Sequence, residues 1–140
     1  MTTVREDIRL ALSNLSMAYT PYSDHKVSSV LVTKKGAVYT GVNIENAAYS
    51  PTICAERTAF AKAVSEGERD FDRIIIVGGL HGNVKSYCAP CGVCRQVMME
   101  FCDPKTFRVI LAITEDDYKE FTLEEILPMG FGPKDLDKEV

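Results

Sequence analysis

Two short stretches of this sequence carry residue types that could do chemistry together. Cys54 and Glu56 lie in the stretch ICAERT, and Cys91 and Cys94 lie in the stretch APCGVCR. Cysteine thiolates bind zinc, and three protein ligands leave the fourth position of a tetrahedral zinc ion free for water. A carboxylate beside that position can transfer protons. The sequence therefore predicts a catalytic site with Cys54, Cys91 and Cys94 as ligands of one zinc ion per subunit and Glu56 as the proton-transfer group.

The second stretch has the pattern of a helix start. Pro90 suits the first turn of a helix, where its missing N–H has no partner to lose, and Cys91 and Cys94 are spaced to lie on one face of that turn. Unpaired N–H groups and the positive end of the helix dipole favour thiolates there. Three thiolates outweigh the charge of one zinc ion. We expect Arg57 or Arg95, each next to a site residue, to offset part of that excess.

The composition limits the class of protein. At 140 residues, 46% hydrophobic and 26% charged, the chain has the size and balance of one globular domain, and we expect a single domain over residues 1–140. A net charge of -4 argues against a nucleic-acid partner and favours a small-molecule substrate. No apolar run approaches the length of a membrane span, and the first ten residues lack the apolar core of a signal peptide. These features predict a cytoplasmic protein with no membrane partner.

The cysteine count favours metal binding over disulfides. The five cysteines are an odd number, and three of them fall within residues 88–94. Two other interpretations remain open. In the first, Cys88 completes a closed four-cysteine structural zinc module that has no place for water. In the second, Cys91 and Cys94 form a dithiol redox pair. The sequence assigns no role to Cys102.

The elements that must position these residues follow from periodicity and turn signals. Apolar residues spaced three and four apart predict a helix from Thr3 to Tyr19, with Thr3 and Glu6 as a capping box. Later strand-helix-strand alternation predicts parallel pairing, and so a mixed sheet between helical layers. The remaining expected elements are an antiparallel hairpin of strands 26–33 and 37–43, helices beginning near residues 54 and 91, strands 73–79 and 107–114, and a short helix within 122–136.

Taken together, Cys-x-Glu followed by Pro-Cys-x-x-Cys is the pattern of zinc-dependent nucleobase deaminases. The chain resembles the small zinc-dependent cytidine deaminases of pyrimidine salvage over nearly its whole length. Further runs that carry the resemblance are AYTPYS, GVNIENAAYS, KAVSEG and EEILPMGF. The resemblance implies a three-layer α/β/α sandwich with a mixed five-stranded sheet, a homotetramer, and hydrolytic deamination of cytidine and 2′-deoxycytidine to uridine and 2′-deoxyuridine.

The resemblance also implies roles for residues outside the cysteine stretches. Asn43 and Glu45 are expected to hold the ribose hydroxyls, and the backbone of Ala55 to lie against the base. Phe131 corresponds to an aromatic residue that members of this family lend to the pocket of a neighbouring subunit.

The chain departs from the family pattern near the start of its first strand. His25 stands where the family usually has a phenylalanine of the base-binding wall, and Ser28 and Ser29 replace a Gly-Ala pair. A histidine can donate a hydrogen bond or carry a charge where phenylalanine only packs. The departure makes a modified cytosine nucleoside, such as a nucleoside antibiotic, an alternative substrate.

Overall fold

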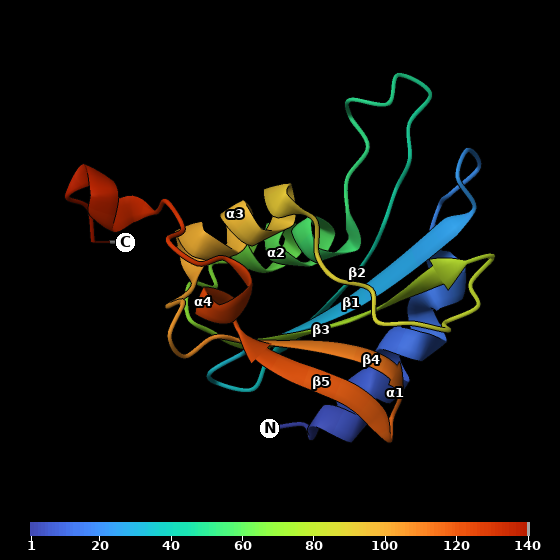
Figure 1. Cartoon of the computed structure of the whole chain (residues 1–140), viewed down its shortest axis with the longest axis horizontal. Helices are drawn as coiled ribbons and strands as arrows, with labels where there is room; N and C mark the ends of the chain where they lie inside the picture. The colour runs from blue at the N-terminus through green and yellow to red at the C-terminus, as the bar shows by residue number, and fades with distance from the viewer. Residues whose placement is uncertain (140) are drawn as a thin grey trace.

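The computed structural model describes residues 1–139 and is built around one five-stranded sheet (Figure 1). The strands lie in the order β2-β1-β3-β4-β5. β3 and β4 pair in parallel, and the other neighbouring strands pair antiparallel. The strands are β1 (His25–Thr33), β2 (Val38–Val42), β3 (Phe71–Leu80), β4 (Arg108–Thr114) and β5 (Asp117–Thr122).

Helices cover both faces of this sheet. One core lies between the sheet and α1, and a second lies between the sheet and the pair α2 and α3 (Figure 1). The predicted three-layer α/β/α sandwich is therefore confirmed. The α-helices are α1 (Val4–Asn14), α2 (Ala55–Ser65), α3 (Gly92–Phe101) and α4 (Leu123–Ile126), and two 3-10 turns are η1 (Leu15–Met17) and η2 (Pro133–Leu136).

The first helix begins as predicted and ends earlier. Thr3 and Glu6 form the expected capping box, with each side chain accepting a hydrogen bond from the backbone of the other. The α-helix ends at Asn14 and continues only as the 3-10 turn Leu15–Met17, so the predicted extension to Tyr19 is wrong. Serine and asparagine are frequent in this last stretch, and their side chains compete with the helix for backbone hydrogen bonds.

The predicted hairpin and the two crossovers are present, with one difference. β1 and β2 form an antiparallel hairpin, and the crossover through α3 joins the parallel neighbours β3 and β4. The crossover through α2 joins β2 to β3, but β1 lies between these two strands and pairs with both. β2 and β3 therefore run in the same direction without pairing, because the hairpin places β1 on the inner side.

One strand had no prediction from periodicity. β5 follows β4 through a tight turn and pairs with it antiparallel at the edge of the sheet. Most of its side chains are exposed and charged or polar. An edge strand with a solvated face lacks the apolar run that marks the inner strands.

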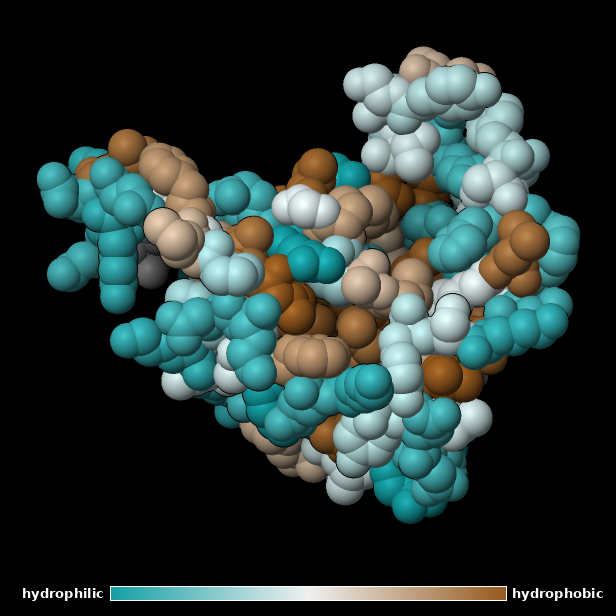
Figure 2. All heavy atoms as spheres, viewed as in Figure 1, coloured by the Kyte–Doolittle hydropathy of each residue, from teal (hydrophilic) through white to brown (hydrophobic). Residues whose placement is uncertain are grey.

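Two segments extend from the body of the molecule. The loop between β2 and α2 and the C-terminal segment after α4 project from opposite sides of the view in Figure 1. Hydrophobic residues, coloured brown in Figure 2, gather on the surface between these projections. No helix among residues 1–139 is long and apolar enough to cross a membrane.

Candidate metal centre and active site

Two helix starts bring the predicted metal ligands together. Cys54 is the N-cap of α2 and Cys91 is the N-cap of α3, and both have extended backbone angles. Neither side chain makes a capping hydrogen bond, so both thiols are free to point elsewhere. Cys94 lies in the first turn of α3 and is buried. Because α2 and α3 lie on the same face of the sheet, their N-termini place all three cysteines in one group.

The three sulfur atoms have the spacing that tetrahedral zinc requires. The Sγ atoms of Cys54 and Cys91 are 3.8 Å apart, and those of Cys91 and Cys94 are 3.6 Å apart. All three lie within 4.8 Å of one another. Sulfur atoms bonded at ~2.3 Å to one tetrahedral zinc ion are separated by about 3.8 Å. The thiols therefore fit one zinc ion.

The other two cysteines lie outside this group. Cys88 packs beside Gly78 of β3, where an added Cβ would lie 2.9 Å from the Cys88 sulfur. Burial raises the pKa of Cys88 to about 11. Cys102 is the C-cap of α3 and belongs to the hydrophobic core. Among the described residues the metal-binding group contains three thiols, which does not match the closed four-cysteine alternative.

The surroundings shift the pKa values of Cys54 and Cys94 in opposite directions. Hydrogen bonding from Cys94, followed by that from Arg57 and Cys91, lowers the pKa of Cys54 to about 5. The pKa of Cys94 is raised, first because its thiol donates to Cys54 and then because it is buried. The lowered pKa favours the thiolate form of Cys54, and a thiolate is the form of cysteine that binds a metal cation.

Glu56 occupies a buried position beside the thiols. Its side chain is buried, with 4% of the residue exposed, and its Oε1 atom has no hydrogen-bond partner among the described residues. Burial, reinforced by the negative charge of Cys54, raises the pKa of Glu56 to about 7. A carboxyl group with this pKa exists in both protonation states near neutral pH, so it can accept and return a proton. Buried polar atoms without a hydrogen-bond partner are rare in folded proteins, so the free Oε1 atom indicates a position where a ligand binds.

The two predicted charge-balancing arginines lie in different surroundings. Arg57 donates from Nη2 to the Sγ atom of Cys54 over 3.4 Å. Arg95 donates from Nε to the carbonyl of Pro90 over 2.8 Å and from Nη1 to the carbonyl of Ile126. Arg57 therefore contacts the thiol group, whereas Arg95 ties the segment before α3 to α4.

Asn43 and Glu45 lie on the segment that leaves β2. The Asn43 amide donates to the carbonyl of His25 over 2.8 Å and accepts from the N–H of Val27 over 2.9 Å. The Glu45 carboxylate accepts from the N–H groups of Tyr22 and Ser23, at 3.0 and 3.1 Å, and from the Ser23 hydroxyl. Both side chains are therefore held in fixed orientations beside the start of β1.

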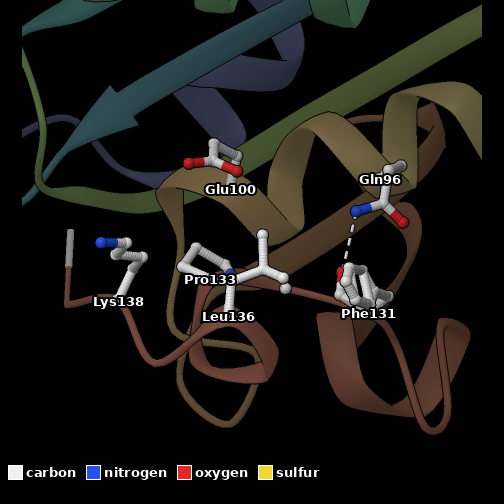
Figure 3. Close-up of a pocket in the computed structure, with 7 residues that line it drawn as sticks. Gln96, Glu100, Phe131, Pro133, Leu136 and Lys138 are labelled. Carbon is white, nitrogen blue, oxygen red and sulfur yellow. Dashed lines mark hydrogen bonds between the residues drawn. The ribbon is translucent and has the colours of Figure 1, made fainter.

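His25 is close to this loop, whereas Phe131 is not. His25 opens β1 with an exposed side chain, and its N–H donates to the Ser23 hydroxyl. Phe131 is 54% exposed on the C-terminal segment, where its carbonyl accepts a hydrogen bond of 2.8 Å from Gln96 of α3 (Figure 3). This segment lies on the other side of the molecule from the β2-α2 loop in Figure 1. Ala55 is fully buried at the first position of α2.

Sequence reasoning missed two residues that orient the site. Ser23 holds both Glu45 and the N–H of His25 through one hydroxyl. Thr58 donates its hydroxyl to the carbonyls of Val42 and Cys54, each at 3.1 Å. Serine and threonine near turns and helix starts often form hydrogen bonds to the local backbone, and this tendency was the sequence feature that could have identified them. Sequence spacing alone did not reveal the long-range partners.

Three comparisons relate this arrangement to known proteins. Residues 1–110 match the family described as "Cytidine and deoxycytidylate deaminase zinc-binding region". The chain is 46% identical to a cytidine deaminase of Sporosarcina psychrophila over 119 residues, which cover 85% of this chain and 84% of that protein. It is 29% identical to a blasticidin-S deaminase of Bacillus cereus over 130 residues, covering 90% of each. A crystal structure of cytidine deaminase from Burkholderia pseudomallei superposes with a TM-score of 0.84 at 39% identity, covering 93% of this chain and 100% of that one.

Proposed function

The chain belongs to the family of zinc-binding cytidine and deoxycytidylate deaminases, and from that membership we propose that it hydrolyses cytidine and 2′-deoxycytidine to uridine and 2′-deoxyuridine with release of ammonia. The observation that carries this proposal is the buried Glu56 carboxyl, whose Oε1 atom lacks a partner and which lies two residues from a ligand of the three-thiol group. In a purely structural zinc site such a carboxyl group would only lower stability, because a buried carboxyl oxygen without a hydrogen-bond partner is unfavourable.

Each site residue has a distinct task in the proposed reaction. Cys54, Cys91 and Cys94 hold zinc, which when bound supplies Lewis-acid activation of water near neutral pH. Glu56 takes one proton from water and delivers it to ring N3 while the water oxygen bonds to C4. It then moves the second proton of that water from this oxygen to the amino group, whose bond to C4 breaks. The oxygen of water remains on C4 and ammonia leaves. Arg57 stabilises the negative charge on Cys54 through its hydrogen bond.

The substrate is held by residues at the start of β1 and on the β2-α2 loop. Asn43 and Glu45 bind the ribose hydroxyls with the hydrogen-bonding capacity that their internal bonds leave free. The backbone of Ala55 lies against the base. A surface hollow lined by Tyr22, Ser23 and Glu45, together with Tyr49 and Thr52, supports this placement of the sugar.

The direct test measures zinc content and ammonia release on the purified protein. We expect one zinc ion per chain and turnover of cytidine and 2′-deoxycytidine. Glu56→Gln keeps the shape of the side chain and removes proton transfer, so the rate should fall by about 10²- to 10⁴-fold while zinc and the melting temperature are retained. A Glu56→Gln enzyme with more than about a tenth of the normal rate would remove Glu56 from this role.

A modified cytosine nucleoside is a second candidate substrate for the same chemistry. Two observations favour it, namely the similarity to a blasticidin-S deaminase and the exposed His25 at the start of β1. If cytidine is the substrate, His25→Phe should leave kcat/KM on cytidine equal or raise it by up to about tenfold, since an aromatic contact contributes about 0.5 to 1.5 kcal/mol. If His25 hydrogen-bonds a group that cytidine lacks, the substitution should abolish activity on that compound alone. A panel of cytosine nucleosides assayed with both proteins distinguishes the two.

We also propose a homotetramer in which Phe131 reaches the pocket of a neighbouring subunit. The exposure of Phe131, Met129 and Leu136 on a projecting segment supports this arrangement, because large apolar side chains on a projection favour a protein contact. Light scattering should give four times the mass of the chain. Phe131→Ala should raise KM clearly and should change the melting temperature little. A fully active monomer would contradict the arrangement.

A place in pyrimidine salvage and a cytoplasmic location remain predictions. Deamination of free nucleosides makes uridine available from cytidine, which is the chemistry that salvage requires. A host that lacks its own cytidine deaminase and needs a uracil source should grow on cytidine when it expresses this chain. The matched control is the Glu56→Gln variant, which should not support growth.

A further inference from the structure

Two adjacent serines of β1 have the same chemistry and different surroundings. Ser28 and Ser29 are both fully buried. The Ser29 hydroxyl donates a hydrogen bond of 2.9 Å to the carbonyl of Ala55. The Ser28 hydroxyl has no partner among the described residues. Side chains alternate along a strand, so Ser29 faces α2 and Ser28 faces the side of the sheet that α1 covers.

The acceptor of the Ser29 bond is at a sensitive position. Ala55 is the first residue of α2, and its peptide groups connect the zinc ligand Cys54 to Glu56. A carbonyl at this position accepts the helical N–H from four residues ahead, and its second lone pair remains available. Ser29 occupies that lone pair from the sheet. The bond therefore attaches the first turn of α2 to β1, independently of the hydrogen bonds within the helix.

The neighbouring strand leaves room for this attachment. Gly41 of β2 is the register partner of Ser29. A Cβ atom at Gly41 would lie 2.2 Å from the Ala55 carbonyl oxygen and 2.6 Å from the Ala59 nitrogen. The backbone of α2 thus rests directly on the sheet at this point. Gly41 allows the close approach, and the Ser29 hydroxyl provides a directional bond within it.

We propose that Ser29, which stands where the family usually has alanine, is a positioning residue of this particular chain for the deamination reaction. By fixing the Ala55 carbonyl, its hydroxyl sets where the Cys54 sulfur and the Glu56 carboxylate lie relative to the two thiols of α3. The hydrogen bond of the Ser29 hydroxyl goes to the backbone of Ala55, so Ser29 acts through the backbone of α2. The expected effect of Ser29 on turnover rests on the proposed function, whereas its expected effect on zinc retention is independent of that function.

Removing the hydroxyl should affect catalysis more than folding. Ser29→Ala deletes a buried donor, and the Ala55 carbonyl keeps its helical hydrogen bond, so little is left unsatisfied. The first turn of α2 becomes free to shift, and a misplacement of ~1 Å can reduce a rate by about 10²-fold. We expect kcat to fall by about five- to fiftyfold with KM changed by less than about threefold. Zinc should be lost to a chelator at least about three times faster.

The adjacent serine provides the matched control. Ser28→Ala removes an unpartnered buried hydroxyl from the opposite face, so kcat and zinc loss should match the unmodified enzyme, with an equal or higher melting temperature. The experiment compares kcat, KM, melting temperature and the rate of zinc loss for both variants. If Ser29→Ala matches Ser28→Ala in kcat and zinc loss, the positioning role is overturned.

A second pair of variants separates the hydrogen bond from packing, including the case in which Ser29→Ala does not fold. Ser29→Thr and Ser29→Val have nearly the same shape and differ in the hydroxyl. The threonine enzyme should retain more kcat and lose zinc more slowly than the valine enzyme, and equal values would overturn the inference. Zinc loss requires no turnover, so an unmodified protein that binds zinc but releases no ammonia would refute the proposed function while leaving this test intact.

Discussion

The four α-helices within residues 1–139 begin in two different ways. α1 and α4 start with capping boxes, in which a threonine accepts a bond from the N–H three residues ahead and a glutamate accepts one from the N–H of that threonine. The pairs are Thr3 with Glu6 and Thr122 with Glu125. These starts use their side chains to satisfy the helix backbone, which typically contributes about 1 kcal/mol to stability.

The starts of α2 and α3 do not use their side chains in this way. Cys54 and Cys91 occupy the N-cap positions, and neither makes a capping hydrogen bond. Their thiols point instead to one another and to Cys94. The positive end of each helix dipole then stabilises thiolate charge. The helix starts with the better caps therefore have structural roles, and those with poorer caps form the metal centre.

The stability that α2 lacks at its cap is recovered along its length. Ala55, Ala59, Phe60 and Ala63 are buried on the sheet, and Phe60 packs against three other phenylalanines. Such burial contributes more than one capping bond, since a fully buried large side chain contributes about 1.5 to 3 kcal/mol. Because packing stabilises α2, its N-cap residue can be a metal-binding cysteine in place of a residue that caps the helix.

The largest expected difference between the two kinds of start follows from removing a thiol. Cys91→Ala should lose zinc and activity completely and lower the melting temperature, because metal binding contributes to folding free energy. Metal analysis and thermal unfolding measure both. Cys88→Ala is the matched control, and should keep zinc and activity because its sulfur packs beside Gly78 instead. Equal zinc loss in the two variants would restore the four-cysteine alternative.

A smaller effect is expected from moving the start of α2 while leaving its thiol in place. Gly41→Ala places a Cβ against the backbone of α2, which should destabilise the fold by about 1 to 3 kcal/mol. Activity should also fall, because the first turn carries Glu56. Gly92→Ala, at the start of α3, is the control for stability, since no neighbouring atom lies within 4 Å of the Cβ that it would add. An unchanged melting temperature for Gly41→Ala would mean that the close approach of α2 has no energetic consequence.

The smallest effect is expected at the capped start of α1. Thr3→Ala removes the capping hydroxyl and should lower the free energy of unfolding by about 1 kcal/mol, with kcat and zinc content unchanged. Denaturant unfolding measures the loss. Thr106→Ala, an exposed threonine before β4, should change stability by less than about 0.5 kcal/mol. A change in zinc content after Thr3→Ala would show that the two kinds of helix start are not independent.

Local patterns in the sequence predicted much of the fold and the centre of the site. The capping box at Thr3, the hairpin, the helices at both cysteine stretches and the three-thiol group are present as predicted. Periodicity failed where the local signal was weak. It extended the first helix past Asn14, and it did not identify β5, whose solvated edge position leaves it few apolar residues.

The sequence by itself determined which chemistry is available, because residue type and spacing decide what a thiol or a carboxyl group beside a helix start can do. It did not decide between Arg57 and Arg95, or distinguish Ser28 from Ser29, since each pair has equivalent chemistry in the sequence. Those differences depend on strand pairing and on which face of the sheet a side chain occupies. They arise from contacts between residues far apart in the chain, such as that of Ser29 with Ala55, and only the tertiary structure brings such residues together.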